Sequence, residues 1–130
     1  MIGIEGKSVF LSGPMTGLPK WNKEAFAKAE ERLYELGAEW VFNPATDAPK
    51  TDFDPYGHDY WMACTLHELT TLPQHYGDSG FSPVYDMLAL LPGWEASKGA
   101  RVECEVAHAI GLVVIEMPKE WLIAEGEEAE

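Results

Sequence analysis

A carboxylate stands near the start of a predicted helix that follows a loop of small residues. In "LPGWEASKGARVECEVAHAIG" (residues 91–111), Gly99 follows two residues after Ser97, and Glu103 follows six residues after it. At about 100° per residue, the apolar side chains of this helix share one face, formed by Val102, Val106, Ala109 and Ile110. Glu103 is predicted to point on or beside that face, whereas Glu105 points the other way. A carboxylate aimed at the side that a helix buries needs an explanation.

Three explanations are open for Glu103 from the residues alone. It can reach solvent from the first helical turn, where the helix dipole favours a negative charge. It can pair with a buried cation, or it can face a cleft as a nucleophile or a base. Burying a lone carboxylate is costly, so an idle one is not expected deep in a core. Ser97 has two compatible interpretations, as the helix N-cap and as part of an anion-binding site.

A second loop with suitable chemistry follows the first predicted strand. It is formed by Gly13, Pro14, Met15, Thr16 and Gly17. The loop lacks the Gly-Lys-Ser/Thr of a P-loop and the G-x-G-x-x-G of a dinucleotide site. Free amides and small residues after a strand can hold one phosphate or a sugar, and an ordinary tight turn is the alternative.

Metal and thiol chemistry receive less support. Cys64, His67, His58 and His75 match no standard spacing of zinc ligands. Cys104 has no evident base beside it and is expected to face away from the apolar side of its helix, which predicts a passive thiol. We therefore predict neither a metal nor a cofactor.

The composition limits the classes of partner. The 130 residues carry a formal net charge of −13, which disfavours binding to nucleic-acid polymers. The basic residues near the two loops can hold a single phosphate or can be solvated surface charges: Lys20, Lys23, Lys98 and Arg101. No apolar run approaches the roughly 18 residues of a membrane span, and the start of the chain does not resemble a signal peptide. With two cysteines, the expectation is a cytoplasmic protein that binds no membrane.

The elements alternate along the chain. Strands are predicted at residues 7–12, 39–44, 84–91 and 111–117, and helices at residues 22–37, 58–72 and 98–110, the first of them capped by Asn22. This order predicts a single small doubly wound α/β domain with a parallel sheet of four or five strands and helices on both faces. The interior is expected to hold Val9, Leu11, Val41, Leu88, Leu90, Val114 and Ile115. The domain is expected to span residues 1–118, followed by an acidic tail at residues 119–130. Ligands of such folds bind beyond the carboxyl ends of the strands, where both loops fall.

The stretches at residues 7–44 and 84–115 resemble a phage and bacterial family described as nucleoside 2-deoxyribosyltransferase-like. The resemblance is carried by "GPMTG", by "NP" at residues 43–44, and by "LPGWE-x-S-x-GA-x-x-E". The superfamily hallmark is an Asp or Ser, then a Gly two residues on, then a Glu six residues on. Ser97, Gly99 and Glu103 match that pattern, which implies that Glu103 is the nucleophile that attacks the anomeric carbon of a sugar.

The resemblance also implies a substrate. Branches that act on nucleosides have Asp at the position of Ser97, whereas branches that act on nucleoside 5′-monophosphates have Ser there. The implied reaction is therefore cleavage or transfer at the N-glycosidic bond of a (deoxy)nucleoside 5′-monophosphate, without a cofactor. Residues 13–17 are expected near the phosphate, and Trp94 is expected among the substrate-binding residues. The implied location is the cytosol of a bacterium or of a phage-infected host.

The sequence departs from the superfamily at two places. Phe10 stands where a Tyr is common near the nucleophile, so a hydroxyl is missing there. The second catalytic carboxylate should lie eight residues before the Asp that opens the third strand, and counting back from Asp86 gives Asp78. Residues 73–83 do not read as the helix that normally carries this group, so Thr65 or Asp59 can take its place.

A second function class stays open beside the enzyme. A catalytically silent protein could bind or sequester a nucleotide, and Phe10 with the unclear second carboxylate favours that alternative. A structural protein without a ligand is disfavoured because both loops fall at the ligand-binding edge of the fold. Relatives complete their sites across subunit contacts, and the chain has many aromatic residues, so a homodimer or higher homo-oligomer is expected.

Overall fold

One sheet of four parallel strands organises the molecule. The computed structural model describes residues 3–15, 18–47, 57–71 and 84–122. The strands are β1 (Ser8–Ser12), β2 (Trp40–Phe42), β3 (Met87–Leu90) and β4 (Val113–Glu116), in the spatial order β2-β1-β3-β4. All three neighbouring pairs are parallel, which confirms the predicted parallel α/β sheet.

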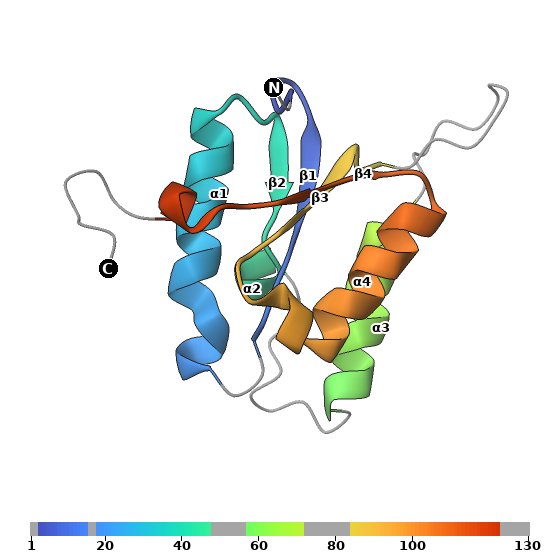
Figure 1. Cartoon of the computed structure of the whole chain (residues 1–130). Helices are drawn as coiled ribbons and strands as arrows, with labels where there is room; N and C mark the ends of the chain where they lie inside the picture. Colours follow the sequence, from blue (N-terminus) through green and yellow to red (C-terminus); the bar gives the residue numbers. More distant parts are fainter. Residues whose placement is uncertain (1–2, 16–17, 48–56, 72–83, 123–130) are drawn as a thin grey trace, which may run out of the picture.

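Helices cover both faces of this sheet (Figure 1). The α-helices are α1 (Lys23–Glu35), α2 (Pro44–Asp47), α3 (Gly57–Leu69) and α4 (Lys98–Ala109). The described residues also form three short 3-10 helices, which are η1 (Pro19–Asn22) before α1, η2 (Trp94–Ala96) before α4 and η3 (Lys119–Leu122) after β4. The turns of α2, η1 and η2 fall where the sequence predicted loops or a strand end. The three longer predicted helices are present, and their ends lie within three residues of the prediction.

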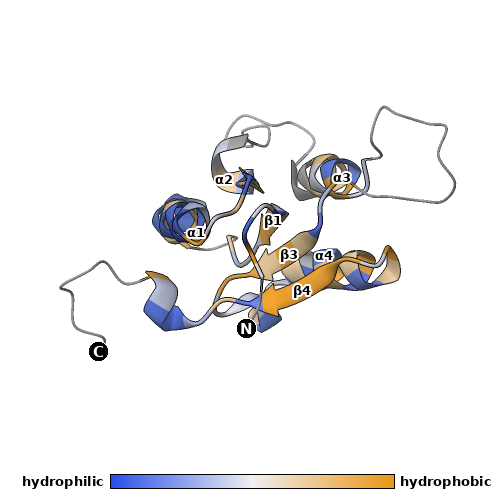
Figure 2. Cartoon of the chain, turned by 90° about the horizontal axis from the view of Figure 1, so that it is seen from above, coloured by the Kyte–Doolittle hydropathy of each residue, from blue (hydrophilic) through white to orange (hydrophobic). Residues whose placement is uncertain are grey.

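Alternation along the strands divides the core into two layers. On one face, Val9, Leu11 and Val41 join one cluster with Phe26 and Leu33 of α1. On the other face, the second cluster contains residues of three strands and of α3 and α4: Phe10, Phe42, Leu88, Leu90, Leu69, Cys104 and Ala107. Figure 2 shows the hydrophobic strands β3 and β4 beside α4, whose own surface is mixed in hydropathy. Each strand residue therefore packs against one helical layer according to its place in the alternation.

The predicted interior is confirmed except at one position. Six of the expected core residues are buried: Val9, Leu11, Val41, Leu88, Leu90 and Ile115. Val114 is only half-buried. It lies on β4, which among the described strands has a neighbour on one side alone, so less of the sheet and helix layer covers it.

The predicted buried face of α4 is wrong. The buried residues of this helix are Ala100, Glu103, Cys104 and Ala107, whereas Val102 is 36% exposed and Ala109 is also exposed. Val106 and Ile110 are half-buried at the margin. Small residues on α4 allow a close approach to the bulky side chains of Phe10, Leu88 and Leu90 on the sheet. The periodicity predicted that Cys104 faces away from the core, and this prediction is wrong because its side chain points into the core.

The segment after β4 crosses towards α1. Trp121 and Leu122 of η3 pack against the cluster that α1 covers, so the beginning of the predicted tail joins the core. Residues 123–130 lie outside the described part. Within the described residues, no helix combines the length and the apolar character needed to cross a membrane.

Candidate active site

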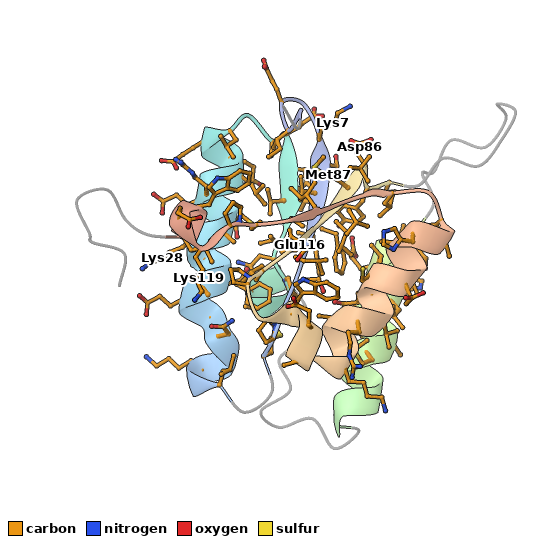
Figure 3. The ribbon with its side chains drawn as sticks, in the orientation of Figure 1. Lys7, Lys28, Asp86, Met87, Glu116 and Lys119 are labelled. Carbon is orange, nitrogen blue, oxygen red and sulfur yellow. The ribbon has the colours of Figure 1, made fainter. Side chains whose placement is uncertain are left out.

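The carboxyl ends of β1 and β3 lie side by side at the point where the strand order of the sheet reverses. The strand order β2-β1-β3-β4 places the two neighbouring strands β1 and β3 between connections that run to opposite sides. Ser12 ends β1 and is paired in register with Leu90, the last residue of β3. In Figure 3, Asp86 and Met87 mark the beginning of β3, and Glu116 marks the carboxyl end of β4. Open α/β sheets bind ligands at such a switch point, beyond the carboxyl ends of the strands.

The two loops singled out in the sequence begin at this point and touch each other. The amide of Leu91 donates to the carbonyl of Ser12 at 2.8 Å. A Cβ on Gly13 would lie 2.7 Å from the Cβ of Leu91, and a Cβ on Gly93 would lie 3.7 Å from Pro14. Only glycine at position 13 allows the first loop to lie this close to the second.

Asn22 fastens the first loop from the other end. Its Nδ2 donates to the carbonyl of Pro14 at 3.0 Å. Asn22 occupies the N-cap position of α1, as predicted, but it has a left-handed backbone (φ 63°) and its side chain makes no capping bond. The preceding turn of η1 already leads the chain into the helix, which frees the Asn22 amide to hold the loop.

Replacing Gly13 tests how firmly the two loops pack. Gly13→Ala should lower the free energy of unfolding by about 1–3 kcal/mol, because Leu91 is buried and cannot move aside freely. Gly3→Ala is the matched control, since a Cβ there meets nothing within 4 Å. Urea unfolding of both variants measures the difference, and equal stability would show that the close approach at Gly13 is not needed.

Glu103 projects from the second turn of α4 into this edge of the sheet. It is buried with 6% of its surface exposed, and its Oε1 accepts a hydrogen bond from Ser12 Oγ at 2.5 Å. Thr65 of α3 also makes a side-chain hydrogen bond with the Glu103 carboxyl. Among the described residues, the buried polar or charged side chains are Ser12, Asn43, Thr65 and Glu103. Three of these four therefore meet at one place, brought together from β1, α3 and α4.

Burial sets the protonation of this carboxyl. The pKa of Glu103 is raised from the ordinary 4.5 to about 7, because the rise caused by desolvation outweighs the lowering by the bonds with Ser12 and Thr65. A carboxyl with such a pKa exists near neutrality both as a proton donor and as a charged nucleophile or base. In the described part of the chain, Glu103 neither extends to solvent nor pairs with a cation. Of the three explanations considered from the sequence, the one that remains is a nucleophile or base at this edge of the sheet.

Ser97 and Gly99 begin the helix that carries Glu103. Ser97 Oγ accepts from the amide of Ala100 at 3.1 Å, which confirms the N-cap interpretation. Gly99 lies in the first turn of α4, half-buried. The hydroxyl of Ser97 keeps its proton while it accepts this bond, so the side chain can still donate to a ligand.

Trp94 lies in η2, directly after the turn that ends β3. Its Nε1 donates to Glu116 Oε1 at 3.0 Å, which ties η2 to the carboxyl end of β4. The ring is half-buried and packs against the cluster beneath α4. The loop residues Gly13, Pro14 and Met15 are half-buried at the neighbouring strand end. The structure therefore brings these predicted binding residues to the same edge as Glu103.

Some predicted positions are outside the described part. Thr16, Gly17 and Asp78 fall in segments that the structure does not describe, and nothing is described of the Asp59 side chain. The role of Asp78 as a second catalytic carboxylate stays a prediction. Thr65, the alternative considered for that place, is in contact with Glu103.

Two residues to which the sequence analysis gave no role at the site also belong to this edge. Ser12 could have been found as a polar residue at the end of an apolar strand, two positions after Phe10 and so on the same face. Asn43 stands in the same way after β2, where its Nδ2 donates to Glu30 at 2.9 Å and its Oδ1 accepts from the Ala45 amide at 2.9 Å. Asn43 therefore shapes the turn into α2, whereas Ser12 contacts the carboxylate.

Phe10 completes the apolar floor beneath Ser12. Its ring stacks on Phe42 at 5.0 Å and meets Tyr85 edge-on at 5.6 Å between ring centroids. The hydroxyl of Tyr85 donates to Glu68 Oε2 at 2.6 Å. Phe10 is thus a core residue in this protein, and the hydroxyls at the site come from other positions.

The described residues contain no group of three or more His, Cys, Asp or Glu side chains that could hold a metal ion. Cys104 is buried, with its Sγ 3.8 Å from Nδ1 of His108. Burial, followed by the charges of Glu105 and Glu116, raises the pKa of the Cys104 thiol. His108 is therefore a base beside Cys104, which corrects the expectation that none lies there. A buried thiol with a raised pKa is a poor nucleophile, and the passive role of Cys104 stays a prediction.

Comparison with known proteins gives one match. Residues 7–116 match the family model described as Domain of unknown function (DUF4406). No curated protein and no solved structure matches the chain. The matched segment runs from the residue before β1 to the end of β4, so it includes both loops and Glu103.

Proposed function

The chain belongs to the DUF4406 family, and we propose that it cleaves or transfers the N-glycosidic bond of a (deoxy)nucleoside 5′-monophosphate, with Glu103 as the nucleophile. The observation that carries this proposal is the position of Glu103, a buried carboxyl at the switch point between β1 and β3. The resemblance of "LPGWE-x-S-x-GA-x-x-E" to nucleoside 2-deoxyribosyltransferase-like proteins supports the same role. A carboxyl is costly to bury, and a reaction gives a reason to keep it there.

A carboxylate suits the chemistry of this bond. In the first step, a Glu103 oxygen bonds to the anomeric carbon while the N-glycosidic bond breaks. The electron pair of the broken bond leaves with the base, and the base takes up a proton. In the second step, water attacks the anomeric carbon and loses a proton, and the Glu103 carboxylate leaves. The products are a free base and a sugar 5-phosphate; a second base in place of water gives a new nucleotide. The negative charge of Glu103 also stabilises the oxocarbenium-like transition state.

The start of α4 supports a 5′-phosphate as part of the substrate. Ser97 places a hydroxyl at the N-terminus of a helix of 12 residues, where the dipole favours an anion. The exposed Lys98 and Arg101 add positive charge in the same turn. An Asp at position 97 would repel a phosphate, whereas Ser can donate to one.

A silent nucleotide-binding protein is the alternative, and one observation favours it. Glu103 is only 6% exposed and is already bonded to Ser12 and Thr65, so a substrate has to displace neighbouring groups to reach it. In this alternative, the neutral Glu103 is a hydrogen-bond donor or a structural group, and the nucleotide is bound without reaction.

The proposed function predicts release of free base with a preference for monophosphates. The wild-type protein and Ser97→Asp are incubated with a panel of nucleosides and their 5′-monophosphates, and free base is separated and quantified. The wild type should act on a monophosphate in preference to its nucleoside. In Ser97→Asp that preference should fall at least about tenfold, because one charge-assisted donor is lost and repulsion is added.

Asp is itself a good N-cap, so Ser97→Asp should leave α4 and the stability of the fold in place. Calorimetry provides the second readout. Tight binding of a monophosphate without any base release would contradict the proposed enzyme and would favour the silent nucleotide-binding protein. Equal affinity of the wild type for nucleoside and monophosphate would end the argument for a phosphate subsite.

A further inference from the structure

Two buried hydroxyls meet the Glu103 carboxyl from different elements. Ser12 Oγ, at the end of β1, donates to Oε1 at 2.5 Å, and Thr65, on α3, bonds the same carboxyl. Ser12 and Thr65 are each 1% exposed. The distance from Ser12 is in the range of a charge-assisted O–H···O⁻ bond, which stabilises the ionised carboxyl more than the neutral one.

Thr65 has one hydroxyl proton and two partners for it. Its Oγ1 lies 3.2 Å from the carbonyl of Met62, one turn earlier in α3, and it also bonds Glu103. When Glu103 is neutral, the carboxyl can donate to Thr65, whose own proton then goes to Met62. An ionised carboxylate only accepts, so Thr65 must then turn its proton towards Glu103 and leave the Met62 carbonyl.

We propose that Ser12 and Thr65 are positioning residues for the Glu103 carboxylate, Ser12 as a fixed donor and Thr65 as a donor that turns when Glu103 loses its proton. Together they hold the charged form so that an oxygen can be directed at the anomeric carbon. The reference to the anomeric carbon rests on the proposed function, whereas the bonding arrangement does not. Phe10, two residues before Ser12 on the same strand face, has no hydroxyl to offer, so these two positions supply the donors.

The balance of burial and bonding gives these hydroxyls a measurable effect. Burial raises the pKa of Glu103, and the Ser12 and Thr65 bonds lower it again, Ser12 more than Thr65. The result is a pKa of about 7, so a substantial fraction of the nucleophile is charged near neutrality. Removal of either donor should leave the carboxyl neutral to higher pH.

Other charges are not in a position to replace the hydroxyls. On the described parts of the elements around Glu103, the ionisable side chains that are exposed are His67, Glu95, Lys98, Arg101, Glu105, His108 and Glu116. Glu68 accepts from Tyr85, Cys104 contacts His108, and Cys64 is half-buried. The causes that shift the Glu103 pKa are desolvation and the two hydroxyls.

The test follows the Glu103 carboxyl directly, in the full chain. Protein labelled with ¹³C in the glutamate carboxyl is titrated by NMR, and the Glu103 signal is identified by its absence in Glu103→Gln. Ser12→Ala and Thr65→Val should each move the titration midpoint of Glu103 upward by about one pH unit. Thr65→Ser, which keeps the hydroxyl, should stay near the wild type. The matched control is Thr70→Val, directly after α3, whose hydroxyl bonds the Leu66 carbonyl at 2.8 Å and is exposed.

A second readout connects the bonding to catalysis. The pH midpoint of base release should move upward in Ser12→Ala and Thr65→Val in parallel with the NMR midpoint. If the wild type releases no base, the proposed function fails, while the NMR titration still decides the role of the hydroxyls. Unchanged NMR midpoints in Ser12→Ala and Thr65→Val would overturn the positioning role. Thr65→Val is close in shape to the native residue, so it decides the question even if Ser12→Ala does not fold.

Discussion

Glu103→Gln is expected to release free base roughly a thousandfold or more slowly than the wild type, while it still folds and binds a nucleoside monophosphate. Gln has nearly the size and much of the hydrogen-bonding capacity of Glu, so Ser12 and Thr65 keep a partner. It lacks the negative charge that stabilises the oxocarbenium-like transition state, and its amide does not form the glycosyl ester. Single-turnover measurements of base release, with calorimetry for binding, separate loss of chemistry from loss of affinity.

Glu105→Gln is the matched control for that experiment. It makes the same change two residues further along α4, on the exposed side of the helix. Its base release should equal that of the wild type within about twofold, because an exposed charge at this distance is screened by solvent. Equal activity of wild type and Glu103→Gln would show that Glu103 is not the nucleophile. Asp78 and Asp59 would then be the next positions to replace.

Glu103→Gln should also raise the free energy of unfolding, but only at the higher pH values. The pKa of Glu103 is raised from 4.5 to about 7 in the folded protein, so between these pH values the unfolded chain loses a proton that the folded one keeps. The folded state therefore loses stability relative to the unfolded state as the pH rises through this range, and the loss is complete above about pH 7. A separation of this size between the two pKa values corresponds to about 3 kcal/mol.

The amide introduced by Glu103→Gln cannot ionise, so this loss should be absent in the variant. Relative to the wild type, the free energy of unfolding of the variant should be nearly unchanged at about pH 4 and higher by about 3 kcal/mol at about pH 8. Urea unfolding of both proteins across this pH range measures the difference. The contributions of the other carboxyl groups to the free energy of unfolding are the same in both proteins and cancel in this difference. Glu105→Gln, which replaces an exposed carboxyl on the same helix, is measured as the control. If the difference in free energy of unfolding between Glu103→Gln and the wild type does not change with pH, burial does not raise the pKa of the Glu103 carboxyl.

The overall architecture could be predicted because each strand carries its own signal. β3 is a run of four buried apolar residues, and such strands are typical of a sheet that is covered on both faces. Alternation with helices then leaves a parallel sheet with right-handed crossovers as the expected arrangement. The carboxyl edge, and with it the neighbourhood of Gly13, Trp94 and Ser97, follows from that topology.

The choice of buried face on α4 could not be read in the same way. The helix has large apolar side chains on one stripe, with Val102 and Val106, and small ones on another, with Ala100 and Ala107. Hydrophobicity alone favours the first stripe. The structure buries the second, because the facing sheet already supplies bulky side chains and close packing leaves room for small ones.

The sequence by itself determined that the chain folds as a parallel α/β domain, and it offered the N-cap role of Ser97 and an inward-pointing Glu103 as candidates beside other interpretations. These features depend on local periodicity, on capping chemistry and on the direction of strands. Only the tertiary structure decided what Glu103 meets there. Ser12 is 91 residues away along the chain and Thr65 lies on a different helix, so their contact with the carboxyl depends on how α3 and α4 dock against the sheet. That docking removes water from the carboxyl and supplies two hydroxyls in its place, and both effects arise from packing that no spacing of residues encodes.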